Sequence, residues 1–142
     1  MRNMLFPLVI VAAAAFGDEG SDRAKLLGTW QPQSTSKEAG TWKLESKGSE
    51  TLRVTQLLGE QKLVELECPT NGQECGMKES GKPAKASLYF NGSKLVELET
   101  KGREVVKRRF GIAGTGDTLE VEIIPIVPAG KSETLWFERV QR

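Results

Sequence analysis

Short runs of alternating apolar and polar residues, separated by turn-forming residues, extend over nearly the whole chain after residue 25. Such alternation places one face of a strand in a core and the other in water, which is typical of antiparallel sheets. The runs cover residues 26–31, 40–47, 50–58, 61–68, 74–79, 85–90, 94–100, 103–110, 117–126 and 132–140. Their close, regular spacing predicts an all-β fold, an antiparallel up-and-down β-barrel of about 8–10 strands.

Apolar residues two positions apart define the face of each run that we expect to be buried. These residues are Leu52, Val54, Val64, Leu66, Val96, Leu98, Leu119, Val121, Ile123, Leu135 and Phe137. The hexapeptide KLVELE occurs at 62–67 and again at 94–99. We interpret it as two similar strands of one barrel, because a repeat protein would need at least three copies.

The segments between the runs carry turn chemistry. Asn71-Gly72 and Asn91-Gly92 each supply two residues that tolerate positive φ, as a type I′ hairpin turn requires. One short helix of one or two turns is predicted over 22–27, with Ser21 as its N-cap.

The first residues of the chain have the pattern of a secretory signal peptide. Arg2 supplies a positive charge, a short apolar run follows, and small residues at Ala13, Ala15 and Gly17 permit cleavage. The apolar run is shorter than a bilayer-spanning helix, which argues against the alternative of a retained membrane anchor. We therefore predict a signal peptide over residues 1–17, with cleavage within residues 15–17.

This leader determines the domain organisation and the compartment that we expect. Residues 18–25 would form a mature N-terminal segment, and residues 26–142 a β-barrel domain in an exported protein, periplasmic or extracellular. Loss of Arg2 leaves 19 basic and 19 acidic residues. This balance gives no electrostatic reason to expect a nucleic-acid partner. No second apolar run follows, so we expect no membrane span in the mature chain, and we expect a monomer.

The composition argues against catalysis and metal binding. The chain has no His, which removes the commonest general base and the commonest metal ligand. Its two Cys, Cys68 and Cys75, are not spaced as a C-x-x-C redox motif. We therefore predict a non-enzymatic protein with no cofactor, no catalytic residues and no metal site.

The two cysteines are instead expected to form a disulfide in an oxidising compartment. A two-residue turn at Asn71-Gly72 would pair Thr70 with Gln73 and Pro69 with Glu74. The same register would then place Cys68 directly opposite Cys75, within bridging distance. A disulfide closing so short a loop contributes roughly 2–3 kcal/mol.

A Gly-x-Trp motif, Gly28 and Trp30, lies on the first predicted strand, and Arg139 lies near the end of the last one. With the LLGTWQP opening and a terminal aromatic-Glu-Arg strand, the chain resembles small secreted bacterial lipocalin-like proteins of the calycin superfamily over about residues 26–140. The resemblance implies that Arg139 packs across the Trp30 indole and closes one end of the barrel. A cation–π contact and carbonyl hydrogen bonds would hold the first and last strands together there.

A basic run, Lys101 to Arg109, contains one residue whose position is unusual. Arg108 shares a strand face with Val106 and Phe110, so it points inward if they do. A guanidinium inside an apolar barrel needs an anion, either a ligand carboxylate or an internal acid. Fatty-acid-binding barrels use late-strand Arg residues in this way, and the resemblance invites the first role. The remaining alternative is an Arg that snorkels to the barrel rim.

The leading functional hypothesis is a barrel that binds a small apolar or amphipathic ligand in its interior. With an inward Arg108, an anionic amphiphile is the ligand expected to bind best. The candidate ligand-binding residues are Trp42, Leu44, Val54, Leu66, Phe90, Leu98, Arg108, Phe110, Val121, Ile123 and Phe137. Two alternatives stay open: a secreted protease inhibitor acting through a flexible segment at 18–23, and an envelope-associated structural module. Fold alone does not choose between them.

Overall fold

A computed structural model describes residues 14–33 and 39–140. It contains one helix and ten strands, close to the predicted runs in number and bounds. These elements are α1 (Ala14–Leu26), β1 (Gly28–Pro32), β2 (Thr41–Ser46), β3 (Thr51–Leu58), β4 (Gln61–Pro69), β5 (Cys75–Glu79), β6 (Lys82–Asn91), β7 (Lys94–Lys101), β8 (Glu104–Ala113), β9 (Thr118–Val127) and β10 (Glu133–Arg139).

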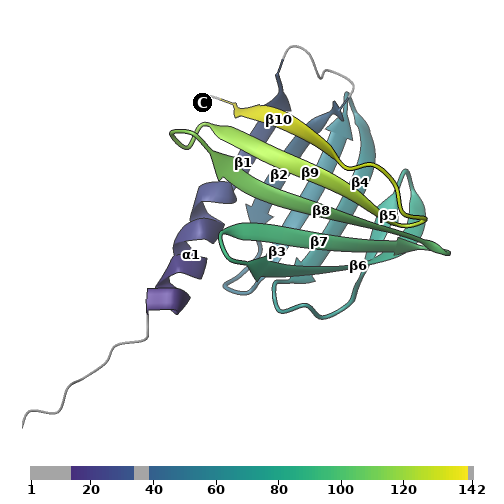
Figure 1. The fold of residues 1–142 in the computed structure, drawn as a ribbon, viewed down its shortest axis with the longest axis horizontal. Coiled ribbons are helices and arrows are strands. Elements are labelled where there is room, and N and C mark those ends of the chain that lie inside the picture. The colour runs from purple at the N-terminus through teal and green to yellow at the C-terminus, as the bar shows by residue number, and fades with distance from the viewer. Residues whose placement is uncertain (1–13, 34–38, 141–142) are drawn as a thin grey trace, which may run out of the picture.

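The ten strands form one closed, antiparallel barrel in which chain neighbours are also spatial neighbours (Figure 1). The barrel closes because β1 pairs with β2 on one side and with β10 on the other. The fold prediction is therefore confirmed, at the upper end of the predicted strand number. Over the described residues, each strand has a paired neighbour on both sides.

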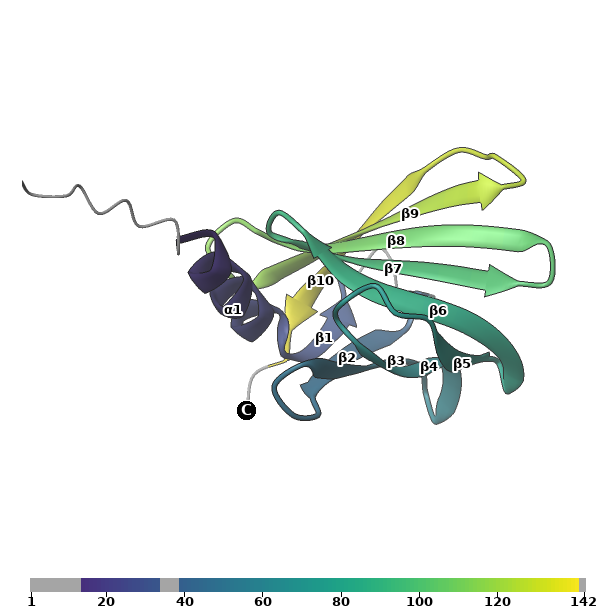
Figure 2. The ribbon, with the colours of Figure 1, turned by 90° about the horizontal axis from the view of Figure 1, so that it is seen from below.

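The two ends of the barrel differ. At one end, which we call the closed end, α1 lies against the turns that follow β2 and β4 (Figure 2). Inward-facing side chains near this end, such as Leu52, Leu119 and Phe137, are fully buried. At the opposite end, the open end, the inward-facing Val106, Ile123 and Leu135 are only partly buried. The interior is therefore filled at the closed end and more accessible at the open end.

Helix α1 is longer than the sequence predicts, and Ser21 lies inside it rather than at its N-cap. The helix is held by tertiary contacts, which local capping signals do not report. Arg23 donates hydrogen bonds to the carbonyl oxygens of Gly48 (3.0 Å) and Thr51 (2.8 Å), and Leu26 is buried in the core. The predicted leader, residues 1–17, lies outside the described residues except for 14–17, which begin α1.

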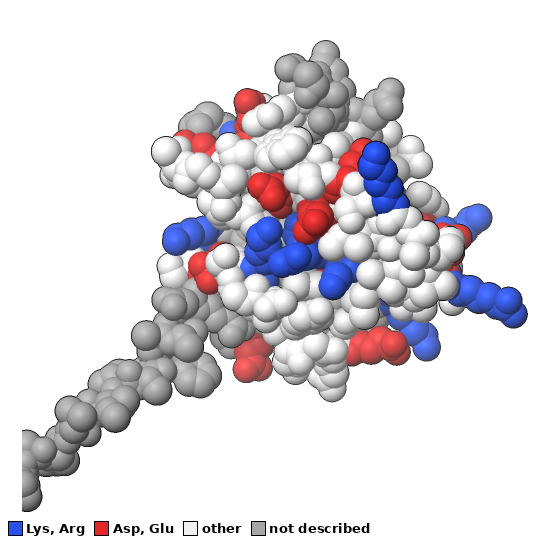
Figure 3. Space-filling view, viewed as in Figure 1, with Lys and Arg blue, Asp and Glu red and all other residues white. Residues whose placement is uncertain are grey.

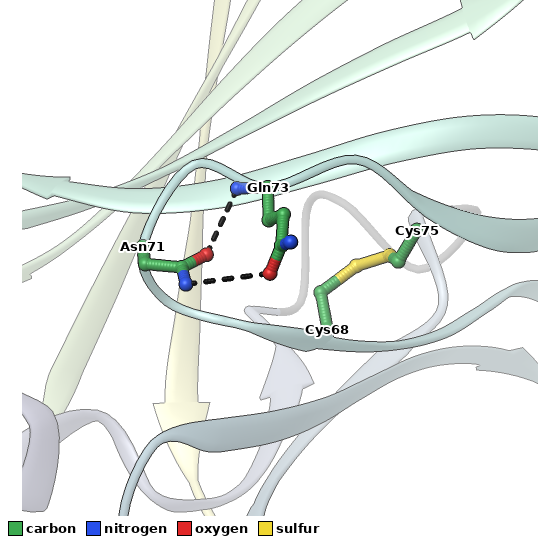
Figure 4. Close-up of a disulfide and its surroundings, with 4 residues drawn as sticks. All are labelled: Cys68, Asn71, Gln73 and Cys75. Carbon is green, nitrogen blue, oxygen red and sulfur yellow. Dashed lines mark hydrogen bonds between the residues drawn. A yellow bond between two sulfur atoms is a disulfide. The ribbon is translucent and has the colours of Figure 1, made fainter.

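The predicted disulfide between Cys68 and Cys75 is present, with the two Cα atoms 5.6 Å apart (Figure 4). The turn between them is not the predicted two-residue hairpin, and the pairs Thr70–Gln73 and Pro69–Glu74 do not form. Asn71 instead bridges to Tyr89 of β6, and its Oδ1 accepts a hydrogen bond from the Gln73 amide (2.9 Å). This Asx turn gives the Gln73 amide a hydrogen-bond partner within the loop. The loop is wider than the two-residue turn that the spacing predicted.

Candidate functional site

The closed end contains the contact that the family resemblance predicts. Trp30 and Arg139 are directly paired on β1 and β10, and the Arg139 guanidinium lies 4.2 Å from the centre of the Trp30 ring. Arg139 also donates hydrogen bonds to the carbonyl oxygens of Leu27 (2.8 Å) and Lys25 (2.9 Å). The Trp30 indole N–H donates to the Leu26 carbonyl (2.9 Å). Barrel closure and helix attachment are therefore joined in one cluster.

Gly28 has two reasons to be glycine. Its φ of +134° lies in a region that L side chains rarely adopt. A Cβ at this position would also lie 2.8 Å from Nη1 of Arg139. Gly28 thus leaves space for the Arg139 side chain, which packs over the Trp30 ring.

We expect Trp30 and Arg139 to be energetically coupled. In a double-mutant cycle of Trp30→Phe and Arg139→Lys, the coupling in the free energy of unfolding should be roughly 0.5–2 kcal/mol, as for a partly desolvated cation–π pair. Urea denaturation of the four proteins measures it. Strictly additive effects would show that the contact stabilises neither strand pairing nor the helix.

Most of the predicted ligand-binding residues do face the barrel interior. Trp42, Leu44, Val54, Leu66, Phe110, Val121 and Phe137 are buried in the core, and Phe90 and Ile123 are partly buried against it. Trp42 and Phe110 meet edge to face, with ring centroids 4.9 Å apart. Many of these side chains pack against each other, so we expect a ligand to contact chiefly the partly buried residues nearer the open end.

The prediction that Leu98 faces the barrel interior is wrong. Leu98 pairs with Ser87 on β6 and with Lys107 on β8, which puts it on the outer face of the barrel. Val96 lies on the same outer face, opposite Arg109. The inward positions of β7 are instead Leu95, Glu97 and Glu99, all buried. A one-residue difference in phase exchanges the two faces of a strand, so the alternation alone predicted the wrong face.

The inward carboxylates of β7 are compensated by Arg108, which points into the barrel. Its Nη1 donates to Oε1 of Glu97 (2.7 Å) and to Oε1 of Glu99 (2.8 Å). Its guanidinium also lies 5.8 Å from the centre of the Trp42 ring. Of the two anions that the sequence left open, the structure supplies the internal acid.

A second ion pair extends this cluster toward the open end. Lys101 Nζ lies 2.9 Å from Oε1 of Glu79, and both side chains are partly exposed. We call Glu79, Glu97, Glu99, Lys101 and Arg108 the inner ionic cluster. Exposure of its carboxylate side chains falls from 25% at Glu79 to 4% at Glu99 and 0% at Glu97. The cluster therefore runs from the open end to a fully desolvated interior.

Burial sets the acid–base behaviour of this cluster. Desolvation raises the pKa of Glu97, and the nearby Arg108 only partly offsets it. Desolvation, with a hydrogen bond to Glu79, raises the pKa of Glu99 to about 7. That hydrogen bond lowers the pKa of Glu79. Burial alone would lower the pKa of Arg108, but Glu97 and Glu99 outweigh it and raise the pKa.

The free energy of unfolding should fall as pH rises from about 5 to 7. A raised folded-state pKa of about 7 means that the folded protein holds a proton that the unfolded chain releases above its ordinary pKa, 4.5. The slope is at most about 1.4 kcal/mol per pH unit for one group. Glu79 acts in the opposite direction, but below pH 4.5. The chain has no His to titrate in this window.

Denaturation curves across this range test the expectation, with Glu99→Gln as the variant. The substitution should reduce the pH dependence and leave the part that comes from the raised pKa of Glu97, whereas Glu120→Gln on the outer face of β9 should leave it unchanged. A wild-type stability that rises between about pH 5 and 7 would contradict the assignment, because the sign for a raised acid is fixed.

Two other residues of the basic run lie on the outer surface. Lys107 and Arg109 project outward from β8, and Arg109 pairs with Glu122 of β9 (3.4 Å). Acidic and basic side chains lie side by side on this face (Figure 3). Arg108 is thus separated from its sequence neighbours by the barrel wall.

Glu79, Glu97 and Glu99 were not predicted as site residues. A signal for the two acids of β7, Glu97 and Glu99, does exist in the sequence. If Gly102-Arg103 is taken as a two-residue turn, Lys101 pairs with Glu104 and counting back places Glu97 opposite Arg108, as observed.

Within the described ranges, no helix is long and apolar enough to cross a membrane, and no cluster of three or more potential metal ligands is present.

Comparison with known proteins shows the class of fold. No family model matches the chain, and no curated protein matches it in sequence. Solved structures do match. A secretory abundant heat soluble (SAHS) protein from Ramazzottius varieornatus is 12% identical, with a TM-score of 0.66 over 82% of this chain and 96% of that one. Fatty-acid-binding protein 1 from Echinococcus granulosus is 8% identical, with a TM-score of 0.67 over 83% and 99%.

A third structure, the Schistosoma mansoni fatty-acid-binding protein in complex with arachidonic acid, is 13% identical, with a TM-score of 0.67 over 84% of this chain and 99% of that one. At these identities the likeness shows the fold alone. The protein has the lipocalin-like calycin fold, in its ten-stranded form. Two of these three structures are those of fatty-acid-binding proteins.

Proposed function

We propose that this protein is an exported, non-enzymatic carrier that holds a small apolar or amphipathic molecule inside its barrel. The observation that carries the proposal is the change in side-chain burial along the barrel interior. Inward-facing Val106, Ile123 and Leu135 at the open end stay partly exposed, while the closed end is filled. An apolar inner wall beside a few polar groups is the usual composition of a small-molecule site.

Export is part of the proposal and has a direct test. N-terminal sequencing of the exported protein should find a start between Phe16 and Asp18, because the small residues before these positions permit cleavage. Such a chain keeps Arg23 and Leu26, the α1 residues that contact the barrel. A start at Met1 would contradict export by this signal.

Native mass spectrometry tests the carrier function. Protein purified from its own source should carry a bound mass that is lost on denaturation. Ile123→Trp, which fills the interior, should reduce the bound fraction, whereas Ile124→Trp on the outer face of the same strand should not. Circular dichroism checks that both variants fold. A purified protein without bound mass that takes up no apolar probe would overturn the proposal.

The inhibitor alternative requires a free, flexible segment at residues 18–23. The structure includes these residues in α1, and Arg23 at its end is hydrogen-bonded to the barrel. No described feature favours that alternative over a carrier.

A further inference from the structure

The inner ionic cluster holds more acids than bases. Three carboxyl groups, from Glu79, Glu97 and Glu99, contact two cations, Lys101 and Arg108. Arg108 makes both of its close contacts through the same nitrogen, Nη1. The cluster therefore carries one negative charge in excess when all of its members are ionised.

One carboxylate oxygen of the cluster has no partner. Oε2 of Glu97 is fully buried and makes no hydrogen bond within the part of the chain that the structure describes. A buried acceptor without a donor is destabilising, and more so when it is charged. The deepest carboxylate of the cluster, that of Glu97, therefore has one oxygen for which the described residues supply no hydrogen-bond donor.

The Glu79 and Glu99 carboxyl groups are also short of a donor. The pKa of Glu99 is raised and that of Glu79 is lowered by their mutual interaction, which is the behaviour of two carboxyl groups that share one proton. That proton removes the excess charge at low pH. Above about pH 7, the raised pKa of Glu99, the site must hold the charge or obtain a cation elsewhere.

We propose that the inner ionic cluster is a headgroup site that selects an amphiphile with a cationic nitrogen, such as a primary alkylammonium, over a fatty acid anion. This inference rests on the carrier function proposed above. The ammonium would donate to Glu99 and Glu79 and take the place of the shared proton. Its charge would also compensate the excess around Glu97.

A ligand carboxylate fits this wall poorly. Arg108, the guanidinium that the sequence offered to an anionic ligand, is already engaged by two internal carboxylates. An incoming anion would meet three acids against two bases, and like charges in a desolvated site repel strongly. The anionic preference expected from sequence is therefore replaced by its opposite.

The geometry allows the headgroup to reach the cluster from the open end. Glu79 and Lys101 are partly exposed there, with 25% and 38% of their side chains accessible. The apolar part of the ligand would lie along Val106, opposite Glu99, and Ile123, opposite Arg108. Headgroup and tail thus have adjacent partners on one wall.

Binding of three probes with the same chain, decylamine, decanol and decanoate, tests the inference below the concentrations at which they form micelles. Fluorescence of Trp42, whose ring lies 5.8 Å from the Arg108 guanidinium, provides the readout. We expect decylamine to bind at least about tenfold more tightly than decanol at about pH 8, and decanoate to bind weakest. From pH 6 to 8 the affinity for decylamine should rise about tenfold, since Glu99 ionises and the amine, with a pKa near 10.4, stays charged. Decanol should show no such rise.

Variants separate the cluster from general electrostatics. Glu99→Gln should bring decylamine to within about threefold of decanol and remove the pH effect, whereas Glu120→Gln on the outer face should preserve both. Equal binding of decylamine and decanol, or a preference for decanoate, would overturn the headgroup inference and leave the carrier function standing. Failure of all three probes to bind would overturn the carrier function itself. If Glu99→Gln does not fold, the wild-type comparison between pH 6 and 8 still decides.

Discussion

Replacement of Arg108 by Met should lower the free energy of unfolding by about 3–5 kcal/mol at about pH 8. Arg108 is the partner of two carboxylates that are almost fully buried, Glu97 and Glu99. Methionine fills much of the same volume but supplies no charge, so both acids remain desolvated and unpaired. The loss should shrink at about pH 5, because protonated carboxyl groups tolerate burial far better than ionised ones. Urea denaturation at the two pH values measures both effects.

The adjacent arginine provides the control. Arg109 points outward and pairs with the partly exposed Glu122, so Arg109→Met should change stability by no more than about 1 kcal/mol. A triple variant with Arg108→Met, Glu97→Leu and Glu99→Leu should recover much of the lost stability, since an apolar replacement of a buried ion cluster is often neutral. Equal effects of Arg108→Met and Arg109→Met would show that the inner ionic cluster is not desolvated in solution.

Trp42→Ala should also destabilise the protein by about 3–5 kcal/mol. The ring is 1% exposed, meets Phe110 edge to face and lies below the Arg108 guanidinium. Its removal leaves a cavity under the inner ionic cluster, where the surrounding barrel can collapse only partly. Denaturation monitored by circular dichroism avoids reliance on the fluorescence that the variant loses.

Trp136 serves as the matched residue for this experiment. It projects outward from β10 and is 45% exposed, so Trp136→Ala should cost about 0.5 kcal/mol or less. A Trp42→Ala protein as stable as Trp136→Ala would mean that the interior is loosely packed. That result would weaken the distinction between a filled and an accessible part of the barrel.

Much of the fold could be predicted because strand patterning is local. The ten alternating runs and the Cys68–Cys75 pairing depend on residues close together in sequence. Neither Asn-Gly turn forms as predicted, since Asn91 pairs with Lys94 and the second turn lies at Gly92-Ser93. Helix α1 was underestimated because Arg23 anchors it to groups more than 20 residues away. Local propensity carries no information about such contacts.

The repeated hexapeptide shows where local patterning fails. In β4, KLVELE turns Val64 and Leu66 inward, whereas in β7 the same letters turn Glu97 and Glu99 inward. The two copies of the hexapeptide also pair with arginines that lie on different faces of their neighbouring strands. On the outer face, Arg53 of β3 pairs with Glu67 (3.0 Å); inside the barrel, Arg108 of β8 pairs with Glu97 (2.7 Å).

Identical local sequence therefore meets different cross-strand partners, and the partner decides which face is buried. The candidate site depends on which face of β7 is buried. The opposite phase would place Glu97 and Glu99 on the outer face, and the inner ionic cluster would not be recognised. Prediction of the site needed the register of β7 against β8 in addition to the alternation within β7.

The arrangement of α1 and β10 determines how the protein can be oriented on a surface. Helix α1 and the end of β10 meet at the closed end, where Arg139 bonds to the Lys25 and Leu27 carbonyl oxygens (Figure 2). An attachment made through either flanking segment therefore holds the barrel by its closed end and directs the other end outward. Immobilisation or fusion at either terminus should leave exchange with the surrounding medium unobstructed, and two barrels joined tail to tail would face in opposite directions.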